Sequence, residues 1–316
     1  MPPELSEISS SEIEAAVDVT PGIDSWCSGP DWILPVHRGF APASEPMVIR
    51  HGDCVALLAS YEATDSERLV AGMEPLWGFA CPMLGRDLTA LAERVAERLE
   101  AEPSSSLVLP GFPADLDLAR QVAGPLSRLG TVGAVPGIVR RLAELDGEGW
   151  WQRRSPTFRR NLRKAKRAAE GAGVEFVDVS RHPDLMDRLL AIERRSWKGR
   201  DRDGITSEPM ELFYRTMIDR LQVRHRCRCF IATLDGQDLG FILGGVRGDR
   251  YRGLQLSYVE AAAHLSIGNL LQAHQVNSLL CSGDASVYDL GMDMDYKSRW
   301  SDRTESSVTV VVRPPS

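Results

Sequence analysis

The sequence lacks any apolar run long enough to cross a membrane, and it has few cysteine and aromatic residues. Its 316 residues include 6 cysteines, and aromatic side chains make up 7%. No stretch of about 18 apolar residues occurs, and the acidic N-terminus does not show the basic and then apolar order of a secretory signal. The scattered cysteines are too few to cross-link so long a chain, which indicates free thiols in a reducing compartment. We therefore expect a cytoplasmic protein without a membrane span.

The sequence also lacks an excess of positive charge. Its net charge is −7, which argues against DNA binding and against general affinity for nucleic acid. One local exception is the segment 153–167, RRSPTFRRNLRKAKR, with eight basic residues and no acidic residue. Ser155 and Pro156 predict a helix start there and Gly171 its end. The outward arginines either form a solvated face or bind an anionic partner, which could be a phosphorylated substrate, an RNA or the protein's own acidic surface.

A metal site is not expected. His225, Cys227 and Cys229 would face the same way on a strand, but they have no fourth ligand nearby in the sequence.

The length and composition predict two domains of ordinary size. The 43% hydrophobic and 26% charged composition is typical of a soluble globular protein. Residues 1–50 are rich in turn signals and predict irregular structure, whereas 47–61 predicts a hairpin. Asp87 predicts a helix cap, and GEGWW at 147–151 predicts a boundary. We expect domains at residues 1–147 and 148–316.

The second half predicts a mixed sheet flanked by helices, an α/β (α+β) arrangement. Its hydrophobic periods change between two and 3.6 several times along the chain. The Asp235-Gly236 pair predicts a hairpin turn. The expected strands are 173–179, 229–234, 239–246, 251–259, 286–290 and 306–312, and the expected helices are 183–197, 208–223 and 266–280.

One stretch, residues 251–280, joins a strand, a short loop and a helix start. Ser266 can cap that helix, and Gly268 in its first turn lets another group come close to the backbone. The free amides of such a helix start attract anions, especially phosphate. On spacing alone, an ordinary βα unit explains the pattern better than a binding site does.

Four stretches resemble the GNAT acyltransferase superfamily: FRRNLRKAKRAAEGAGVEF, AIERRSWKGRDRDGI, HLSIGNLL and YDLGMDMDYKSRW. The likeness is to the branch associated with cellulose biosynthesis (CelD-like), which is related to the Fem aminoacyltransferases. It spans about residues 151–300. The first half resembles a second, degenerate copy, so the resemblance implies two tandem GNAT-like domains.

The resemblance implies a donor site at the start of the 266–280 helix. Ser266, Gly268 and Asn269 would hold the pyrophosphate of acetyl-CoA or another acyl-CoA, and a backbone amide near Val259 would polarise the acyl carbonyl. The family pattern is Q/R-x-x-G-x-G/A, whereas this chain has one glycine. Fem relatives take the acyl group from aminoacyl-tRNA instead. Such a donor, or a phosphorylated acceptor, would lie on the basic helix that carries Arg160 and Arg163.

Acyl transfer to an amine needs a base, a proton donor for the leaving group and a group that stabilises negative charge. Glu260 and His264 are the candidate bases, although a carboxylate or a histidine in a loop is more often simply solvated. Tyr296 is the candidate acid and Lys297 the fixed charge; the alternative is that both only pack and solvate a surface helix.

Four more residues are candidates for the acceptor site. Asp289 and Asp293 could orient the amine or cap a helix. Trp197 and Lys198 could line the acceptor groove, although a tryptophan is commonly part of a core.

Taken together, the sequence predicts an N-acyltransferase that uses acetyl-CoA or another acyl-CoA. The acceptor could be an amine on a sugar, a peptide, a lysine or a small metabolite. A Fem-like aminoacyltransferase that uses aminoacyl-tRNA is the first alternative. A binding module of the same fold without catalysis is the second.

Overall fold

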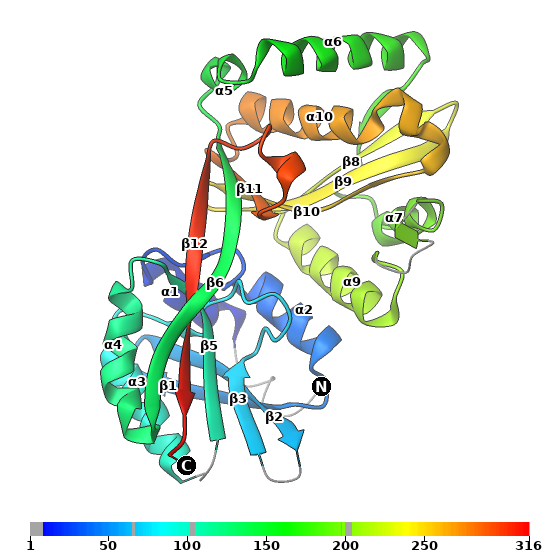
Figure 1. The fold of residues 1–316 in the computed structure, drawn as a ribbon. Coiled ribbons are helices and arrows are strands. Elements are labelled where there is room, and N and C mark those ends of the chain that lie inside the picture. The colour runs from blue at the N-terminus through cyan, green and yellow to red at the C-terminus, as the bar shows by residue number, and fades with distance from the viewer. Residues whose placement is uncertain (1–8, 65–66, 102–104, 197, 200–203, 316) are drawn as a thin grey trace. The chain divides into compact units, whose positions relative to one another are not determined.

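The computed structural model describes residues 9–64, 67–101, 105–196, 198–199 and 204–315 (Figure 1). The chain forms two compact units. Unit 1 consists of Met1–Val139 with Glu305–Ser316, and unit 2 of Arg140–Thr304. Two long strands, β6 (Thr131–Glu144) and β12 (Arg303–Arg313), contribute residues to both units.

Unit 1 begins with two helices that the sequence prediction missed. They are α1 (Ser10–Val19) and α2 (Pro30–Phe40), so the expectation of irregular structure was wrong for these two segments, whereas Pro21-Gly22 stands in a turn as expected. Ser9 caps α1 by accepting a hydrogen bond from the Glu12 N–H at 3.0 Å. Pro30 stands in the first turn of α2, where a proline is compatible with a helix. Pro30, which signalled a turn, therefore starts a helix.

The rest of unit 1 is a sheet with two helices. The hairpin predicted at 47–61 is confirmed, because β1 and β2 pair antiparallel and turn between His51 and Cys54. Asp87 caps α3 as predicted, accepting from the Ala90 N–H at 2.9 Å. The sheet order within the unit is β1-β2-β3-β5-β12-β6, with β4 on β2. The elements are β1 (Glu45–His51), β2 (Cys54–Thr64), β3 (Glu67–Gly72), β4 (Met83–Leu84), α3 (Leu88–Glu100), β5 (Ser105–Pro113), α4 (Asp117–Leu126) and η2 (Ser127–Leu129).

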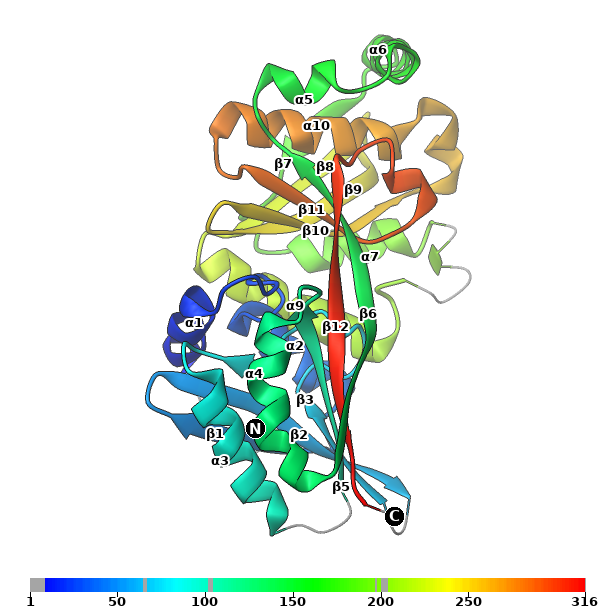
Figure 2. The same ribbon diagram turned by 60° about the vertical axis from the view of Figure 1, so that its left-hand side comes forward.

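Between residues 156 and 292, unit 2 has the order of helices and strands that the sequence predicted. Its sheet runs β6-β11-β10-β9-β8-β7, in which β10 and β11 pair parallel and the other neighbours pair antiparallel. α10 covers one face of the sheet and α7 and α9 cover the other, while α6 lies over α10 (Figures 1 and 2). The elements are α5 (Glu148–Gln152), α6 (Pro156–Gly171), β7 (Glu175–Asp178), α7 (Leu185–Glu193), α9 (Glu208–Val223), β8 (Cys227–Leu234), β9 (Gln237–Arg247), β10 (Arg250–Tyr258), η3 (Glu260–Leu265), α10 (Ile267–Ser282), β11 (Val287–Met292) and η4 (Asp295–Lys297).

The basic helix α6 forms as predicted. Ser155 caps it by accepting from the Phe158 N–H at 3.2 Å, and Pro156 occupies its first turn. Leu162 and Ala169 are buried, and Phe158 packs against the core that contains Trp150, Tyr251, Tyr288 and Trp300. The helix therefore docks by a narrow apolar face and leaves most of its basic side chains outward.

The last strand differs from the prediction in its place. β12 was expected to complete the second domain, but Ser307–Val312 pair with β5 in unit 1. The contacts divide the chain between Val139 and Arg140, whereas the sequence placed a domain boundary at residue 147. The assignment of the two halves as domains stays a prediction.

Candidate functional site

Unit 2 contains a fork where β10 and β11 separate. The two strands pair only at Arg250–Arg252 with Val287–Asp289, and the register of β10 against β9 shifts between Gly253 and Gln255. Beyond this point the strands diverge and leave a cavity of about 600 Å³, which we call the fork cavity. Its lining includes both strands, the start of α10 and the segment from Met294 to Trp300.

The backbone of β10 offers hydrogen-bonding groups to the fork. The Val259 N–H donates to the Leu239 carbonyl at 2.8 Å, so it points toward β9. Peptide groups alternate in direction along a strand, and those of Leu256 and Tyr258 therefore point to the side of β11. In agreement, the Leu256 carbonyl accepts from the Lys198 Nζ at 2.9 Å. The Val259 amide, which the sequence analysis proposed as the polarising group, is therefore bonded within the sheet. The amides that point to the fork are those of Leu256 and Tyr258.

The start of α10 opens on the same cavity. Ser266, Gly268 and Asn269 all line it, so the three predicted donor residues come together. The N–H groups of the first turn have no partner inside the helix. Ser266 precedes the helix as predicted, but it adopts a left-handed conformation with φ 56°. Its side chain forms no capping bond with any described residue.

Gly268 is required by packing. A Cβ at this position would lie 2.9 Å from Cε1 of Tyr258 and 3.3 Å from Cδ2 of Leu256. The sequence predicted that another group approaches the backbone here. In the structure that group is the Tyr258 ring, which leans against the first turn of α10 and lines the fork cavity.

Two lysines flank the fork. Lys297 Nζ donates to the Met292 carbonyl at 2.9 Å at the end of β11. Burial, and then the nearby positive charge of Arg252, lower the pKa of Lys297 to about 8. Lys198 Nζ bonds the Gln255 side chain at 3.1 Å on the β10 side, and burial lowers its pKa as well. Both lysines line the cavity, which therefore carries positive charge into a poorly solvated space.

Asp289 anchors the closed end of the fork. Its carboxylate is fully buried and contacts Arg140, Arg252 at 2.9 Å and Arg250 at 3.6 Å. It also accepts from the Gly291 N–H at 2.8 Å. These contacts fix the strands where they diverge. Arg140 and Arg252 are thus structural members of the site that the sequence did not single out, although Arg252 lies within the strand that it did.

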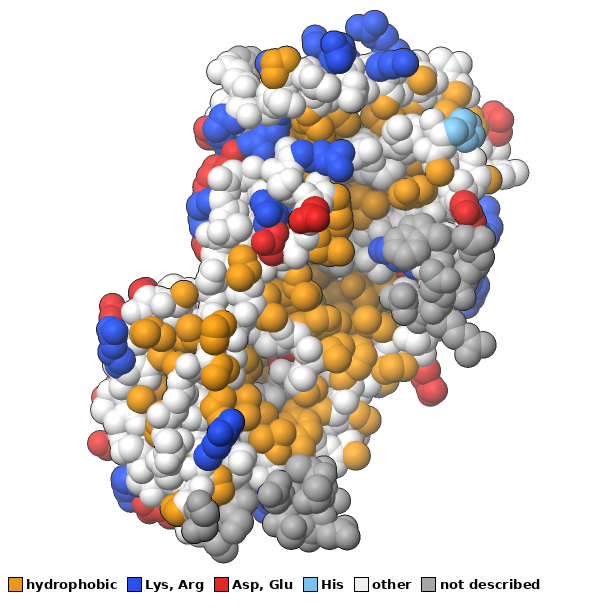
Figure 3. All heavy atoms as spheres, viewed as in Figure 1, with side chains coloured by type: hydrophobic (Ala, Val, Ile, Leu, Met, Phe, Trp, Pro, Cys, Tyr) orange, Lys and Arg blue, Asp and Glu red, His pale blue; other side chains and the backbone are white. Residues whose placement is uncertain are grey.

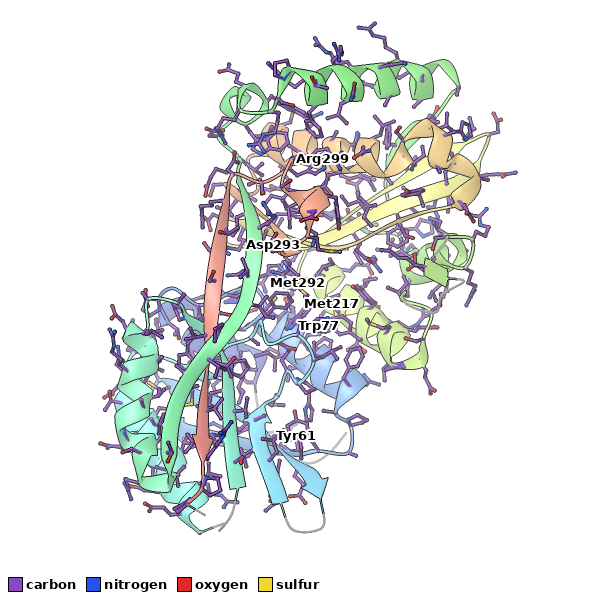
Figure 4. All side chains as sticks on the ribbon, viewed as in Figure 1. Tyr61, Trp77, Met217, Met292, Asp293 and Arg299 are labelled. Carbon is purple, nitrogen blue, oxygen red and sulfur yellow. The ribbon has the colours of Figure 1, made fainter. Side chains whose placement is uncertain are left out.

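Asp293 follows β11 and forms an ion pair with Arg141. Figure 4 shows Asp293 with Met292 at the end of β11, and Arg299 beyond η4. η4 begins after Met294, so neither of the two predicted aspartates stands at its cap position. Ion pairing accounts for both aspartates, and a role in orienting an amine stays a prediction.

The predicted acid lines the fork cavity, whereas the two predicted bases do not. Tyr296 lines the fork cavity, its side chain is 54% exposed, and burial of the remainder raises its pKa. Glu260 and His264 lie on η3 with exposed side chains, outside the described lining of the cavity. His264 Nδ1 lies 2.9 Å from the Ala261 carbonyl.

Glu193 was missed by the sequence analysis. This α7 carboxylate is fully buried, and it accepts from the Ile205 N–H and the Ser196 Oγ, both at 3.4 Å. Its charge raises the pKa of Lys198 and so offsets part of the larger effect of burial. A single glutamate in a helical pattern gives no signal of such burial. Trp197, predicted for the acceptor groove, lies outside the described residues.

The two predicted arginines of α6 lie away from the fork cavity. Arg160 is exposed, and Arg163 lines a separate cavity between α6 and α10. None of the described helices is long and apolar enough to span a membrane. Within the described residues, no cluster of His, Cys, Asp and Glu has an arrangement suited to a metal ion.

Comparisons with known proteins agree with this architecture. FemX resembles the chain with 13% identity and a TM-score of 0.69, covering 95% of this chain and 96% of that one. A conserved protein of unknown function from Bacteroides thetaiotaomicron has 10% identity and a TM-score of 0.61, covering 97% and 98%. The C-terminal domain of a candidate lysylphosphatidylglycerol synthetase from Agrobacterium fabrum has 13% identity and a TM-score of 0.59, covering 95% and 91%.

At these identities the structural likeness establishes the fold. The search of curated proteins found no match. The expected mixed α/β fold is confirmed, and the narrower CelD-like assignment stays a prediction. Residues 156–298 match the family described as acetyltransferase (GNAT) domain.

Proposed function

We propose that unit 2 transfers an acyl group from an acyl-CoA to an amine at the fork cavity. The observation that carries this proposal is the convergence of three features on one cavity. Peptide groups of β10 point into it, the first turn of α10 opens on it, and Lys297 lies at its edge. Each feature supplies one requirement of acyl transfer.

The first turn of α10 suits the phosphates of the donor. The N–H groups of Ile267, Gly268 and Asn269 are unpaired within the helix, and the positive end of the helix dipole lies there. A Cβ at Gly268 would clash with Tyr258, so the residue must stay small. Without a side chain at this position, the backbone of the turn stays accessible from the cavity. These residues fit a pyrophosphate, and CoA when bound would supply the activated thioester.

The peptide N–H groups of Leu256 and Tyr258 would polarise the acyl carbonyl. A donor fixed in place before reaction costs no reorganisation when negative charge develops on the oxygen. Lys297 would stabilise the same charge in its protonated form, and Tyr296 would supply a proton to the leaving thiolate. Both side chains line the cavity.

A second candidate is aminoacyl transfer from aminoacyl-tRNA. The observation in its favour is the outer face of α6, where Arg160, Lys164 and Arg167 are exposed. The only acidic residue of this helix is Glu170, which lies 3.5 Å from Lys166. Such a face suits the phosphate backbone of an RNA, and binding to it would weaken steeply with salt.

The two donors can be distinguished with the full chain. We expect release of free thiol when the protein is mixed with acyl-CoAs and a panel of amines. Lys297→Met should abolish most of this release, whereas the matched surface change Lys164→Met should leave it unaltered. Loss of transfer from charged tRNA in Lys164→Met, with salt-sensitive binding, would instead favour the second candidate.

The proposal fails if no acyl-CoA releases thiol with any amine and acetyl-CoA does not shift the thermal unfolding midpoint. If the same preparation transfers an aminoacyl group from charged tRNA, the site is active and aminoacyl-tRNA, rather than acyl-CoA, is its donor.

A further inference from the structure

A second cavity in unit 2 lies between α6 and α10 and is separate from the fork cavity. We call it the α6–α10 groove. Its volume is about 640 Å³, a size that holds a drug-sized ligand. Its lining consists of Trp151, Arg159, Leu162, Arg163, Lys166, Glu170, Val174, Phe176, Leu270, Ala273, His274 and Asn277. The acyl transfer proposed above makes no use of this groove.

The groove combines an apolar floor with a cationic rim. Leu162, Val174, Leu270 and Ala273 supply aliphatic surface. Figure 3 shows Lys and Arg side chains gathered along α6, with hydrophobic side chains between this helix and the elements beneath it. The basic residues therefore border an apolar surface.

The rim contains a buried hydrogen-bond donor that has no acceptor among the described residues. Arg159 Nε is buried and has no hydrogen-bond partner among the described residues. A buried donor without a partner destabilises the fold, and more so when it is charged. Arg163 stands one turn further along the same face. An anionic group at this end of the groove would satisfy the Arg159 donor and face both charges.

The aromatic residues of the groove favour an aliphatic ligand over a nucleobase. Phe176 stacks on His274 with centroids 4.9 Å apart, and Phe230 meets the same ring edge-on at 4.5 Å. Trp151 packs edge-on against Trp150, and its Nε1 donates to Asn277 Oδ1 at 2.9 Å. These rings already contact one another, and the indole N–H is used. The rest of the apolar lining is aliphatic, from Leu162, Val174, Leu270 and Ala273.

We propose that the α6–α10 groove binds an amphipathic anion, namely an aliphatic chain with a phosphate head. The chain lies on Leu162, Leu270 and Ala273, and the head contacts Arg159 and Arg163. The site is thus a binding site additional to the fork cavity. Its occupant is recognised by the joint presence of an apolar chain and a negative charge.

Calorimetric titration of the full chain with dodecyl phosphate, below its micelle concentration, tests the proposal. Inorganic phosphate and dodecyltrimethylammonium are the matched probes. The first has the negative charge without the aliphatic chain, and the second has the chain with a positive charge. We expect dodecyl phosphate to bind at least tenfold more tightly than either. Equal binding of the cationic amphiphile would overturn the proposal, and so would tighter binding of adenosine monophosphate.

Variants locate the binding. Ala273→Phe fills the groove and should weaken dodecyl phosphate binding at least tenfold, and the smaller change Ala273→Leu should weaken it if the larger one does not fold. Arg159→Gln with Arg163→Gln should also weaken it about tenfold. Arg167→Gln, on the same helix but outside the lining, should change it less than twofold. Unchanged affinity in a folded Ala273 variant would overturn the proposal, and thiol release assayed alongside keeps this result separate from the function of the fork.

Discussion

The fork cavity and the α6–α10 groove lie on either side of the same helix, yet they are built by different means. The fork is made by backbone, because two parallel strands stop pairing after Arg252 and Asp289 and a glycine lets Tyr258 approach the helix. The groove is made by side chains, because α6 docks through a narrow apolar face and keeps its cations at the rim. A site made by backbone should be lost when the residue that holds its strands, here Asp289, is replaced. A site made by side chains should tolerate single substitutions better. The following predictions test this difference.

The largest effect should follow from Asp289→Asn at the closed end of the fork. Removing a buried carboxylate from Arg140 and Arg252 should lower the free energy of unfolding by about 3–5 kcal/mol. Urea denaturation measures it. Asp293→Asn, which alters the more exposed pair with Arg141, should cost about 1 kcal/mol or less. Equal losses in the two variants would show that Asp289 does not anchor the fork.

Lys297→Met should be the most damaging change to activity that leaves the fold intact. Loss of one group that stabilises developing negative charge typically lowers kcat by about 10²–10³-fold. Steady-state thiol release measures the loss, and circular dichroism verifies the fold. Lys297→Arg should recover part of the activity, because it keeps the charge. A variant with methionine that remains fully active would remove Lys297 from the mechanism.

The pH profile should report the same lysine with a defined sign. Its pKa is lowered to about 8, so the protonated form dominates below that value and disappears above it. If the charge is what acts, kcat should fall about tenfold for each pH unit above 8. Activity that rises through this range would assign Lys297 as a base instead. The descending limb should vanish in Lys297→Met.

Gly268→Ala should destabilise the protein by about 1–3 kcal/mol, because the added Cβ overpacks against Tyr258. Tyr258→Ala makes room for it. The double variant should therefore lose less than the sum of the two single losses, as a thermodynamic cycle from chemical denaturation would show. Strict additivity would mean that the ring and the glycine are not coupled. A matched enlargement in the groove, Ala273→Leu, should cost less.

The smallest expected effect is a gain. Ser266 adopts φ 56°, a region that disfavours residues with a Cβ. Ser266→Gly should raise the free energy of unfolding by up to about 1 kcal/mol, since relief of strain exceeds the entropy that glycine adds to the unfolded chain. Thermal unfolding measures it. A loss of stability would show that the Ser266 hydroxyl makes contacts that outweigh the strain.

Local signals predicted much of the chain correctly. Ser155 and Asp87 cap the helices expected of them, and the Asp235-Gly236 turn lies between β8 and β9. The failures occur where composition misled. Pro30 and Pro35 suggested turns but belong to α2, and β6 contains glycines, which are uncommon in strands. A Cβ at Gly137 would lie 2.6 Å from Ser307 Oγ, so this glycine serves the close approach of β12.

The sequence by itself determined the periodic elements, their caps, the cationic face of α6 and the small residue at the start of α10, because these depend on neighbours a few positions apart. Only the tertiary structure decided that β10 and β11 separate into a fork, that Asp289 contacts three arginines and that β12 pairs in unit 1. Each of these joins segments distant in the chain. Register and burial between such segments depend on how whole strands and helices pack, which no local pattern encodes.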